Sequence, residues 1–407
     1  MRRVVITGMA GITSQGSDWE TIRAAFESKR NGIVYMDAWD CYEGLGTRLG
    51  GPIPCFTKPK HFSRKQTRSM GRVALMSTAV TEQALIDAGL QDNPIITDGR
   101  MGVAYGSSSG STSGILDFGR MMLLDKPTAV TATSYIRMMN HTTAVNIGVF
   151  FQLKGRVIPT SSACTSGSQA IGYAYEAIRF GMQDIMVAGG AEELCPTQAS
   201  VFDTLYATSQ KNDAPQTSPR PFDKDRDGLV VGEGAGTLIL EELEHAKARG
   251  ATIYAEVVGF GTNSDGSHIT QPETNTMQVA MELALKDAAL APEAIGYVNA
   301  HGTATDRGDV AESLATNRVF GSRMPISSLK SYWGHTLGAC GALEAWMSIE
   351  MLNSDWYAPT LNLQTIDPLC GELDYIQSEG RSMQNSYVMS NNFAFGGINT
   401  SLIFKRW

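Results

Sequence analysis

The chain has 407 residues, 43% of them hydrophobic and 18% charged, which is enough to bury a large core and to form two or three domains. No apolar run reaches the roughly 18 residues of a membrane span, and the six cysteines lie far apart without a CxxC pair, which indicates neither a disulfide framework nor a metal site. The formal net charge of −8 argues against a general nucleic-acid binder, because neutralising phosphates requires a basic surface.

The N-terminal segment predicts a short buried strand over Arg3 to Gly8 (RVVITG) in place of the apolar region of a signal peptide, so we expect a cytoplasmic protein. The glycines that follow (GMAGITSQG) are weak evidence for a phosphate-binding loop, and a strand-to-loop turn is the better interpretation. A helix is predicted from about Trp19 to Ser28. Residues 32–62 contain three prolines and predict an extended excursion over the surface.

A long helix is predicted over residues 64–90, and its first turns are basic. Lys65, Arg68 and Arg72 fall on one face of this helix, and no acidic residue occurs between Phe56 and Val80. A solvated face would explain these charges, but a basic face on an acidic protein also suits an acidic macromolecular partner.

The stretch from Gly155 to Phe180 (GRVIPTSSACTSGSQAIGYAYEAIRF) reads as a strand, a tight turn, a nucleophile and a helix. It follows a strand at residues 101–107, the flexible segment GSSSGSTSG and a helical region around Tyr135. Cys164 is predicted at the helix N-terminus, where free N–H groups and the helix dipole favour a reactive thiolate. A buried structural cysteine is the alternative interpretation.

A second stretch, residues 328–352 (SLKSYWGHTLGACGALEAWMSIEML), can be laid over the first without gaps, which places His335 on Cys164. Identical residues then meet at four positions: Thr165 and Thr336, Gly167 and Gly338, Ala174 and Ala345, Ile178 and Ile349. This pattern predicts an internal duplication. If the two halves pack about a pseudo-twofold axis, their helix N-termini converge and bring a cysteine and a histidine into one site.

The segments on either side of this duplication alternate between strands and helices. Strands are predicted at 184–193, 237–242, 255–262, 295–301, 326–330, 387–391 and 401–404, and helices at 277–290, 310–320 and from His335 onward. A polar loop, RPFDKDRDGLVVGEGAG, occupies residues 220–236. Two similar halves of this kind predict a layered α/β structure with parallel or mixed sheets, packed as one unit.

Two histidines are candidates for the chemistry. His301 ends an apolar strand (IGYVNAH) and precedes the small residues GTAT, so its imidazole should project into a cleft. His335 begins a helix, whose dipole favours a neutral imidazole that can donate one hydrogen bond. Together they could stabilise an enolate, and Lys330, five residues before His335, could fix the ionisation states in the pocket.

Five motifs in this order resemble the elongating β-ketoacyl-acyl-carrier-protein synthases of the thiolase superfamily, over essentially the whole chain. They are SSACTSGSQAIGYAYEAI, RPFDKDRDGLVVGEGAG, NAHGTATDRGD, SLKSYWGHTLGACGALEA and NNFAFGGIN. The resemblance implies an α/β, thiolase-like fold with duplicated βαβαβαββ halves in a layered αβαβα arrangement. It also implies an N-terminal half, residues 1–250, that carries the nucleophile and a C-terminal half, residues 251–407, that carries the histidines.

The resemblance also assigns roles to individual residues. Cys164 would take an acyl chain from acyl carrier protein, His301 and His335 would promote decarboxylation of a malonyl extender, and Lys330 would support the site. By the same resemblance, the N–H groups of Cys164 and Phe395 would form an oxyanion hole, and Phe395 would gate the acyl pocket. The remaining implied residues are Thr303 and Thr305 on the phosphopantetheine arm, Glu344 in the substrate-binding network, Met138 and Met139 at the chain pocket, and Lys65 and Arg68 at the carrier docking face.

The implied reaction is a ping-pong decarboxylative Claisen condensation in fatty-acid-like or polyketide chain elongation, which makes the chain an acyltransferase. Loss of carbon dioxide generates the carbanion, so neither a metal nor a redox cofactor is required, and the substrates arrive on the phosphopantetheine of acyl carrier protein. Similar enzymes dimerise through their central sheets, which implies a homodimer or a heterodimer with a related subunit.

Some residues depart from the usual pattern of the family. The C-terminal motif reads FAFGGIN, with Ala394 and Ile398 in altered places, and Asp306 stands where a proline usually follows the HGTxT motif. The segment SYIRMMNHTTAVN resembles ketosynthases of aryl-polyene clusters more than the housekeeping fatty-acid enzymes. Those ketosynthases often pair with a chain-length-factor subunit that lacks the cysteine, so this chain would be the active member of such a pair.

Three other classes remain open at the level of sequence. A degradative thiolase would need a second catalytic cysteine near the C-terminus, and Cys370 in PLCGEL lacks that context. A cysteine-dependent thioester hydrolase would use Cys164 and one histidine, and would not require two histidines with Lys330. A chain-length-factor-like partner without activity predicts an unreactive Cys164.

Overall fold

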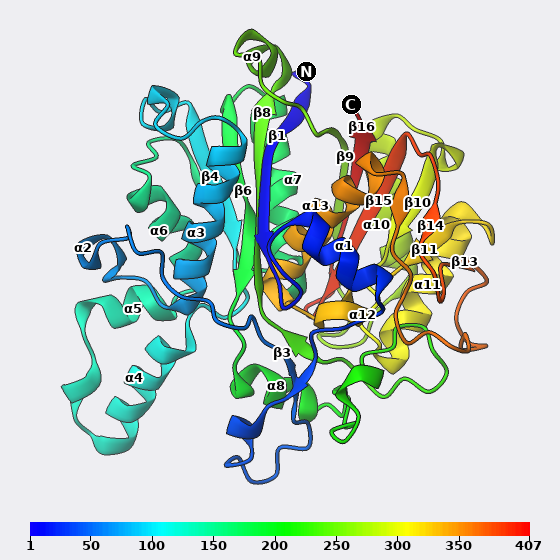
Figure 1. Ribbon diagram of the computed structural model, residues 1–407, viewed down its shortest axis with the longest axis horizontal. Coiled ribbons are helices and arrows are strands. Elements are labelled where there is room, and N and C mark those ends of the chain that lie inside the picture. Colours follow the sequence, from blue (N-terminus) through cyan, green and yellow to red (C-terminus); the bar gives the residue numbers. More distant parts are fainter.

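One mixed sheet of 11 strands runs through the molecule in the order β13-β11-β10-β15-β16-β9-β1-β8-β6-β4-β5 (Figure 1). The structure is a computed structural model that describes all 407 residues except the side chain of Thr128. The strands of the sheet are β1 (Val4–Ile12), β4 (Met101–Gly106), β5 (Val157–Thr160), β6 (Ile185–Glu192), β8 (Gly234–Glu242), β9 (Ala255–Ser264), β10 (Ile295–Asn299), β11 (Pro325–Ser327), β13 (Asp374–Tyr375), β15 (Tyr387–Ala394) and β16 (Ile398–Arg406).

The sheet consists of two halves with the same topology. In the first half the strands lie in the order β5-β4-β6-β8-β1, and in the second half in the equivalent order β11-β10-β15-β16-β9. The first two pairs of neighbours are parallel and the last two are antiparallel in both halves. The halves join where residues 4–6 of β1 pair with residues 255–257 of β9. This repeated order confirms the predicted duplication.

Helices pack in three layers around these sheet halves, so the predicted αβαβα arrangement is confirmed. The outer helices are α3 (Arg72–Asp87) and α6 (Thr142–Phe150) on the first half, and α10 (Thr274–Ala288) and α11 (Asp306–Phe320) on the second. Between the halves lie α7 (Ser166–Arg179) and α13 (Cys340–Asn353), which contact each other. Helix α13 is buried on nearly all sides because almost all of its residues are small or apolar.

Shorter helices and strands lie around this core. They are the helices α1 (Trp19–Glu27), α2 (Arg64–Thr67), α4 (Thr112–Leu124), α5 (Ala132–Met138), α8 (Pro196–Asp203), α9 (Leu243–Ala248) and α12 (Lys330–Trp333), and the strands β2 (Val34–Tyr35), β3 (Leu49–Gly51), β7 (Val231–Gly232), β12 (Trp356–Tyr357) and β14 (Arg381–Ser382). Helices α4 and α5 form a lobe that projects at the lower left of Figure 1. In the part of the chain that the structure describes, no helix has the length and apolar character needed to cross a membrane.

The basic helix predicted over residues 64–90 is interrupted. Helix α2 ends at Thr67, and α3 begins at Arg72 after the N-cap residue Gly71. A Cβ on Gly71 would lie 2.1 Å from the hydroxyl of Ser111, so the chain passes too close to its neighbour there to continue a helix. Arg72 is also removed from the predicted basic face, because its guanidinium donates to the buried carboxylate of Glu233 at 2.5 Å.

The register of the predicted duplication is wrong by three residues. Ala163 and Leu337, which lie 174 residues apart, both adopt left-handed backbone angles, with φ of 51° and 47°. A Cβ on Gly167 or on Gly341 would lie 2.9 Å or 2.5 Å from the backbone of the opposite helix, so the two glycines approach each other's helices reciprocally. The gapless alignment followed small residues, which recur in both segments and do not fix the register.

Two predicted positions change as a result. Lys330 opens α12 instead of ending a strand, and His335 lies in the link between α12 and α13 instead of beginning a helix. Gly334, with φ of 78°, turns the chain there, and the N–H of His335 donates to the carbonyl of Val230 at 2.7 Å. The histidine is therefore held by the strand at Val231, not by its own helix.

Candidate active site

Cys164 lies at the inner end of a cavity of 530 Å³, in the turn that connects β5 to α7. The preceding residue, Ala163, has a left-handed backbone, which is costly for a residue with a side chain. The hydroxyl of Ser166 donates to the carbonyl of Ala163 at 2.7 Å and accepts from the N–H of Ser162 at 3.0 Å. These bonds stabilise a sharp strand-to-helix turn that presents the sulfur atom to the cavity.

The predicted thiolate is wrong for the resting state of this site. Burial raises the pKa of Cys164 to about 12, although Lys330 and the backbone N–H groups of Phe395 and Cys164 itself act in the opposite direction. The sequence argument considered only the helix terminus. In the folded protein the loss of water around the sulfur atom outweighs that local field, so the site favours the thiol over the thiolate.

His335 contacts the nucleophile directly. Its Nε2 lies 3.0 Å from the Sγ of Cys164, while its Nδ1 accepts a hydrogen bond from the N–H of Leu337 at 3.3 Å. Because a neutral imidazole carries one proton, acceptance at Nδ1 places that proton on Nε2, facing the sulfur atom.

His301 lies two residues beyond the end of β10 and takes the same tautomer. Its Nδ1 lies 3.2 Å from the ammonium of Lys330 and 3.4 Å from the amide nitrogen of Asn392, both of which are donors. The proton of His301 is therefore on Nε2 as well. The two imidazole rings are 5.1 Å apart and nearly perpendicular, and both line the cavity with Cys164.

Both imidazoles are neutral, as predicted, but the physical cause differs from the predicted one. Burial lowers the pKa of His301 and of His335 well below the ordinary value, and the ammonium of Lys330 lowers both further. The helix dipole that the sequence suggested for His335 is not needed. Burial, reinforced by a buried cation next to the two histidines, favours their uncharged form.

Lys330 belongs to a fully buried polar network behind the histidines. Its ammonium donates to Glu344 Oε1 at 2.5 Å, and the amide of Asn392 donates to Glu344 Oε2 at 2.7 Å. Glu344 does not line the cavity and lies behind the histidines, so a contact with substrate stays a prediction. Asn392 was missed by the sequence analysis, although it lies in the quoted motif NNFAFGGIN.

Two backbone N–H groups converge on the sulfur atom. Those of Cys164 and Phe395 both form hydrogen bonds that lower the pKa of the thiol. Phe395 lies in the tight turn between β15 and β16, and its ring packs against Phe202 with the centroids 5.3 Å apart. Two N–H groups that point to the same place can stabilise negative charge that develops there.

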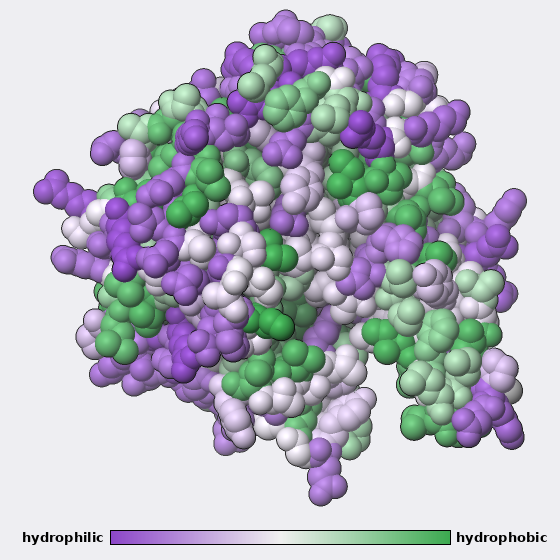
Figure 2. Space-filling model, turned by 180° about the vertical axis from the view of Figure 1, so that it is seen from behind, coloured by the Kyte–Doolittle hydropathy of each residue, from purple (hydrophilic) through white to green (hydrophobic). Residues whose placement is uncertain are grey.

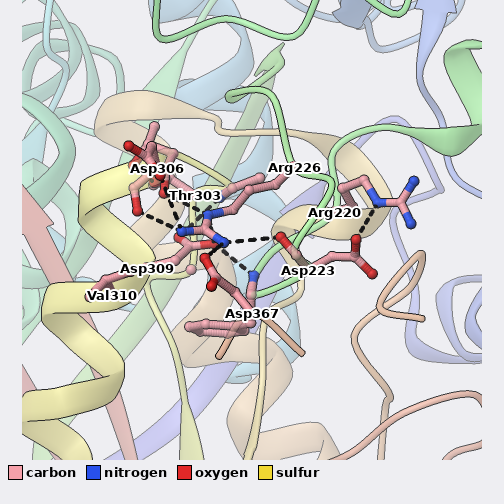
Figure 3. Close-up of polar contacts among 12 residues, drawn as sticks. Arg220, Asp223, Arg226, Thr303, Asp306, Asp309, Val310 and Asp367 are labelled. Atoms are coloured by element: carbon pink, nitrogen blue, oxygen red, sulfur yellow. Dashed lines mark hydrogen bonds and ion pairs between the residues drawn. The ribbon is translucent and has the colours of Figure 1, made fainter. Parts of the chain in front are cut away.

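The cavity wall opposite the sulfur atom is formed by the loop after His301. Thr303 and Thr305 line the cavity, and their hydroxyl oxygens are 2.9 Å apart. Arg226, from the polar loop, lies behind them, and its guanidinium donates to the carbonyls of Thr305 at 3.1 Å and of Asp306 at 2.6 Å (Figure 3).

Arg226 is held in turn by carboxylates. Its side chain is only 2% exposed and lies 2.6 Å from an oxygen of Asp367 and 3.8 Å from one of Asp309 (Figure 3). The sequence analysis quoted this motif without assigning a role to the arginine. Its role depends on contacts with residues about 80 and 140 positions away, which no local pattern reveals.

Besides Lys330 and Glu344, four predicted residues lie outside the cavity. Met138 and Met139 are half-buried at the end of α5, and Lys65 and Arg68 are exposed around the end of α2. None of them lines the cavity that opens onto Cys164. Their predicted roles at the chain pocket and at the carrier docking face therefore stay predictions.

Two groups of side chains in the site could offer ligand atoms to a metal ion, but the ammonium of Lys330 already lies beside them. The ligand atoms of Cys164, His301 and His335 lie within 4.8 Å of one another, as do those of His301, Cys340 and Glu344. The ammonium of Lys330 lies within hydrogen-bonding distance of both His301 and Glu344, so it already supplies a positive charge to the group that contains them. The neutral N–H donors of the first group suit a developing oxyanion better than a metal ion.

Comparisons with known proteins agree with this geometry. Residues 1–246 match the family model described as beta-ketoacyl synthase, N-terminal domain, and residues 254–364 match the one described as beta-ketoacyl synthase, C-terminal domain. The chain is 41% identical to 3-oxoacyl-[acyl-carrier-protein] synthase 2 of Vibrio cholerae, over 100% of this chain and 99% of that protein.

Solved structures show the same relationship. The crystal structure of a beta-ketoacyl synthase from Burkholderia phymatum is 64% identical, with a TM-score of 0.99 and coverage of 100% of both chains. The structure of the ishigamide ketosynthase/chain length factor is 31% identical, with a TM-score of 0.91 and coverage of 100% of this chain and 99% of that one.

Proposed function

Because the chain belongs to the beta-ketoacyl synthase family and is an acyltransferase that condenses acyl chains, we propose that Cys164 carries the acyl group during this reaction. The observation that carries the proposal is a set of four N–H donors around the sulfur atom: Nε2 of His335 lies 3.0 Å from Sγ, a ring nitrogen of His301 lies within 4.8 Å of it, and two backbone N–H groups point to it. Two donors come from His301 and His335, and two from the backbone of Cys164 and Phe395. We also propose that residues 1–250 form the half that carries the nucleophile and residues 251–407 the half that carries the histidines.

In the first half-reaction, the sulfur atom of Cys164 attacks the thioester of an acyl chain on a carrier protein. The negative charge that develops on the carbonyl oxygen is stabilised by the N–H groups of Cys164 and Phe395. The carbon–sulfur bond to the carrier breaks, and the proton of the Cys164 thiol ends on the departing carrier thiol. The exchange consumes no proton overall, so it does not require a permanently ionised cysteine.

In the second half-reaction, a malonyl thioester takes the place of the first carrier. Its carbonyl oxygen accepts hydrogen bonds from Nε2 of His301 and of His335, which stabilise the enolate that forms as the carboxylate leaves as carbon dioxide. The enolate carbon attacks the acyl carbon on Cys164, and the bond to the sulfur atom breaks. The sulfur atom leaves as a thiolate and takes up one proton from the solvent, so each condensation consumes one proton and releases one carbon dioxide.

The walls of the cavity fit a pantetheine arm. Thr303 and Thr305 line it between the histidines and the opening, where their hydroxyl groups can bond the amides of the arm. We infer that Phe395 gates access, because its ring is half-buried against Phe202 and its own N–H contributes to the oxyanion hole. The exposed Lys65 and Arg68 would dock an acidic acyl carrier protein.

A second subunit is also part of the proposal. β5 is the edge strand of the sheet and leaves one side unpaired, with Val157 45% exposed. Large apolar side chains are exposed on the lobe formed by α4 and α5, among them Leu116, Met122, Leu123 and Tyr135. Figure 2 shows this apolar lobe at the lower right. Either a second copy of this chain or a chain-length-factor-like subunit would cover this surface.

Intact-mass analysis tests the proposal. The protein, alone and with a candidate partner subunit, is mixed with acyl carrier proteins loaded with saturated or polyunsaturated chains. A mass gain that disappears in Cys164→Ala establishes the acyl-enzyme, and the chain that loads fastest distinguishes fatty-acid-like from aryl-polyene elongation. No gain with any carrier from a folded protein would favour the inactive partner, and a transient gain that decays to free acid would favour the hydrolase.

A further inference from the structure

The carboxylate of Glu192 has no place in the mechanism above, yet it is fully buried next to the active site. Glu192 ends β6, and its oxygens accept hydrogen bonds from the N–H of Ser108 at 2.7 Å and from the N–H of Gly338 at 3.1 Å. The loop that follows β4 adds further donors, namely the hydroxyl groups of Ser107, Ser108 and Ser109 and the N–H of Ser109. One carboxylate therefore connects the serine loop, residues 107–109, to the first turn before α13.

The hydrogen bonds of Glu192 indicate that its side chain is ionised. Three of the donors are backbone N–H groups, which cannot accept a hydrogen bond in return. A carboxylate accepts from all six donors as they stand, whereas a protonated acid would need one of the serine hydroxyl groups to turn and accept its O–H. Burial raises the pKa of Glu192, and the hydrogen bonds from Ser108, Ser109 and Gly338 oppose that rise.

The turn that Glu192 holds is the one that orients His335. Leu337 has a left-handed backbone, and its N–H donates to Nδ1 of His335. Gly338 follows it, and a Cβ there would lie 2.8 Å from the carboxylate of Glu192 and 2.7 Å from the backbone of Ser108. The close approach therefore requires glycine, and the strained turn is held from one side by this carboxylate.

We propose that Glu192 is a positioning residue that holds the Leu337–Gly338 turn, and so keeps His335 with its Nε2 proton directed at the sulfur atom of Cys164. The inference rests on the proposed function, because it gives Glu192 a role only if His335 takes part in the reaction. It adds a residue on a different strand to the machinery around Cys164.

The neighbouring Glu193 provides a matched control. It accepts from the hydroxyl of Ser111 at 2.8 Å, the N–H of Thr112 at 2.8 Å and the N–H of Val73 at 3.2 Å. Like Glu192 it is a buried carboxylate that holds the segment after β4. Its donors all belong to that segment and to α3, so it has no direct path to His335.

The experiment compares Glu192→Gln with Glu193→Gln in the full-length protein with its partner subunit. For decarboxylation of a malonyl carrier, Glu192→Gln should lower kcat by about tenfold, on the scale of one lost hydrogen bond to a charged group, with KM nearly unchanged. Glu193→Gln should keep a kcat close to that of the unchanged protein. If Glu192 acts through His335, adding Glu192→Gln to His335→Gln should produce no further loss.

A second readout responds to the charge rather than to packing. The ionisable groups that face Cys164 are Lys330, His301, His335, Cys340 and Glu192, and Glu192 raises the pKa of the thiol. Glu192→Gln should therefore speed iodoacetamide labelling of Cys164 at a fixed pH of about 9, where labelling is limited by the thiolate fraction, and Glu193→Gln should not. Equal behaviour of the two variants in both assays, or losses that simply add to that of His335→Gln, would overturn the proposal.

The outcomes separate this inference from the proposed function. Absence of an acyl-enzyme in the unchanged protein would refute the proposed function, whereas normal acylation with unaffected Glu192→Gln kinetics would refute the positioning role alone. If Glu192→Gln does not fold, nitrogen NMR of the His335 imidazole in the unchanged protein still tests the proposal. The proposal requires the Nε2–H tautomer of His335, and an Nδ1–H tautomer contradicts it.

Discussion

Removing the charge of Lys330 should shift the acidic limb of the pH profile for decarboxylation to higher pH. The ammonium lies 3.2 Å from Nδ1 of His301, which at an effective dielectric constant of about 20 corresponds to a repulsion of roughly 5 kcal/mol between the two cations. This repulsion and burial together keep the pKa of His301 well below its ordinary value. In Lys330→Met the repulsion is lost, and we expect the pKa of His301 to rise.

The direction of the activity change follows from the required protonation state. A neutral imidazole with its proton on Nε2 can take part, so activity is present above the pKa of His301 and is lost as the pH falls through it. A raised pKa therefore moves this loss to higher pH. Glu344, left without its cation, would favour the imidazolium still further. The acidic limb of the double variant Lys330→Met/Glu344→Gln should therefore lie at a pH between that of Lys330→Met and that of the unchanged protein.

The assay is kcat/KM for malonyl-carrier decarboxylation between about pH 5 and 9, with circular dichroism at each pH to follow folding. Folding needs this control because breaking a fully buried ion pair costs about 3–5 kcal/mol. A folded Lys330→Met protein whose acidic limb coincides with that of the unchanged protein would refute the argument that Lys330 sets the charge of the histidines.

Three other perturbations test separate parts of the structure. Burial raises the pKa of Cys164 to about 12, so iodoacetamide labelling should still accelerate above pH 9, and a plateau below about pH 8 would contradict this. The lysine in Arg226→Lys cannot donate to the carbonyls of both Thr305 and Asp306, as the planar guanidinium does. KM for the carrier substrate should therefore rise about tenfold, while labelling of Cys164 stays unchanged. A Cβ on Gly190 would lie 2.2 Å from a backbone oxygen of the α13 turn, so Gly190→Ala should lower the melting temperature. Gly119→Ala points into open space on α4 and should raise stability by about 0.5–1 kcal/mol.

The sequence predicted the residues that lie at the ends of regular elements. Cys164 and His301 each follow an apolar strand and precede small residues, and that local pattern places a side chain at the edge of a sheet. His335 and Lys330 were also predicted as site residues, although their predicted places at a helix start and a strand end were wrong, and the structure brings them together with Cys164 and His301.

The other site residues depend on tertiary contacts, which a pattern of residues along the sequence does not reveal. Asn392, Arg226 and Glu192 form hydrogen bonds with residues 48 to 146 positions away in the sequence. The duplication register failed for a related reason. The alignment used identities among small residues, whereas the true register follows the paired left-handed backbone positions at Ala163 and Leu337.

The largest correction, the ionisation of Cys164, explains how the site can function. A helix terminus favours a thiolate in water, but the sulfur atom lies where water is excluded and burial outweighs that field. A resting thiol is compatible with acyl transfer, because the exchange of one thioester for another is proton-neutral and charge develops only on the way to the transition state. The N–H donors around the sulfur atom, among them that of Phe395 and Nε2 of His335, then stabilise the developing charge. The same burial that keeps the cysteine protonated thus makes these hydrogen bonds strong when the charge forms, and it gives the oxyanion hole more influence on the rate than the pKa of the nucleophile.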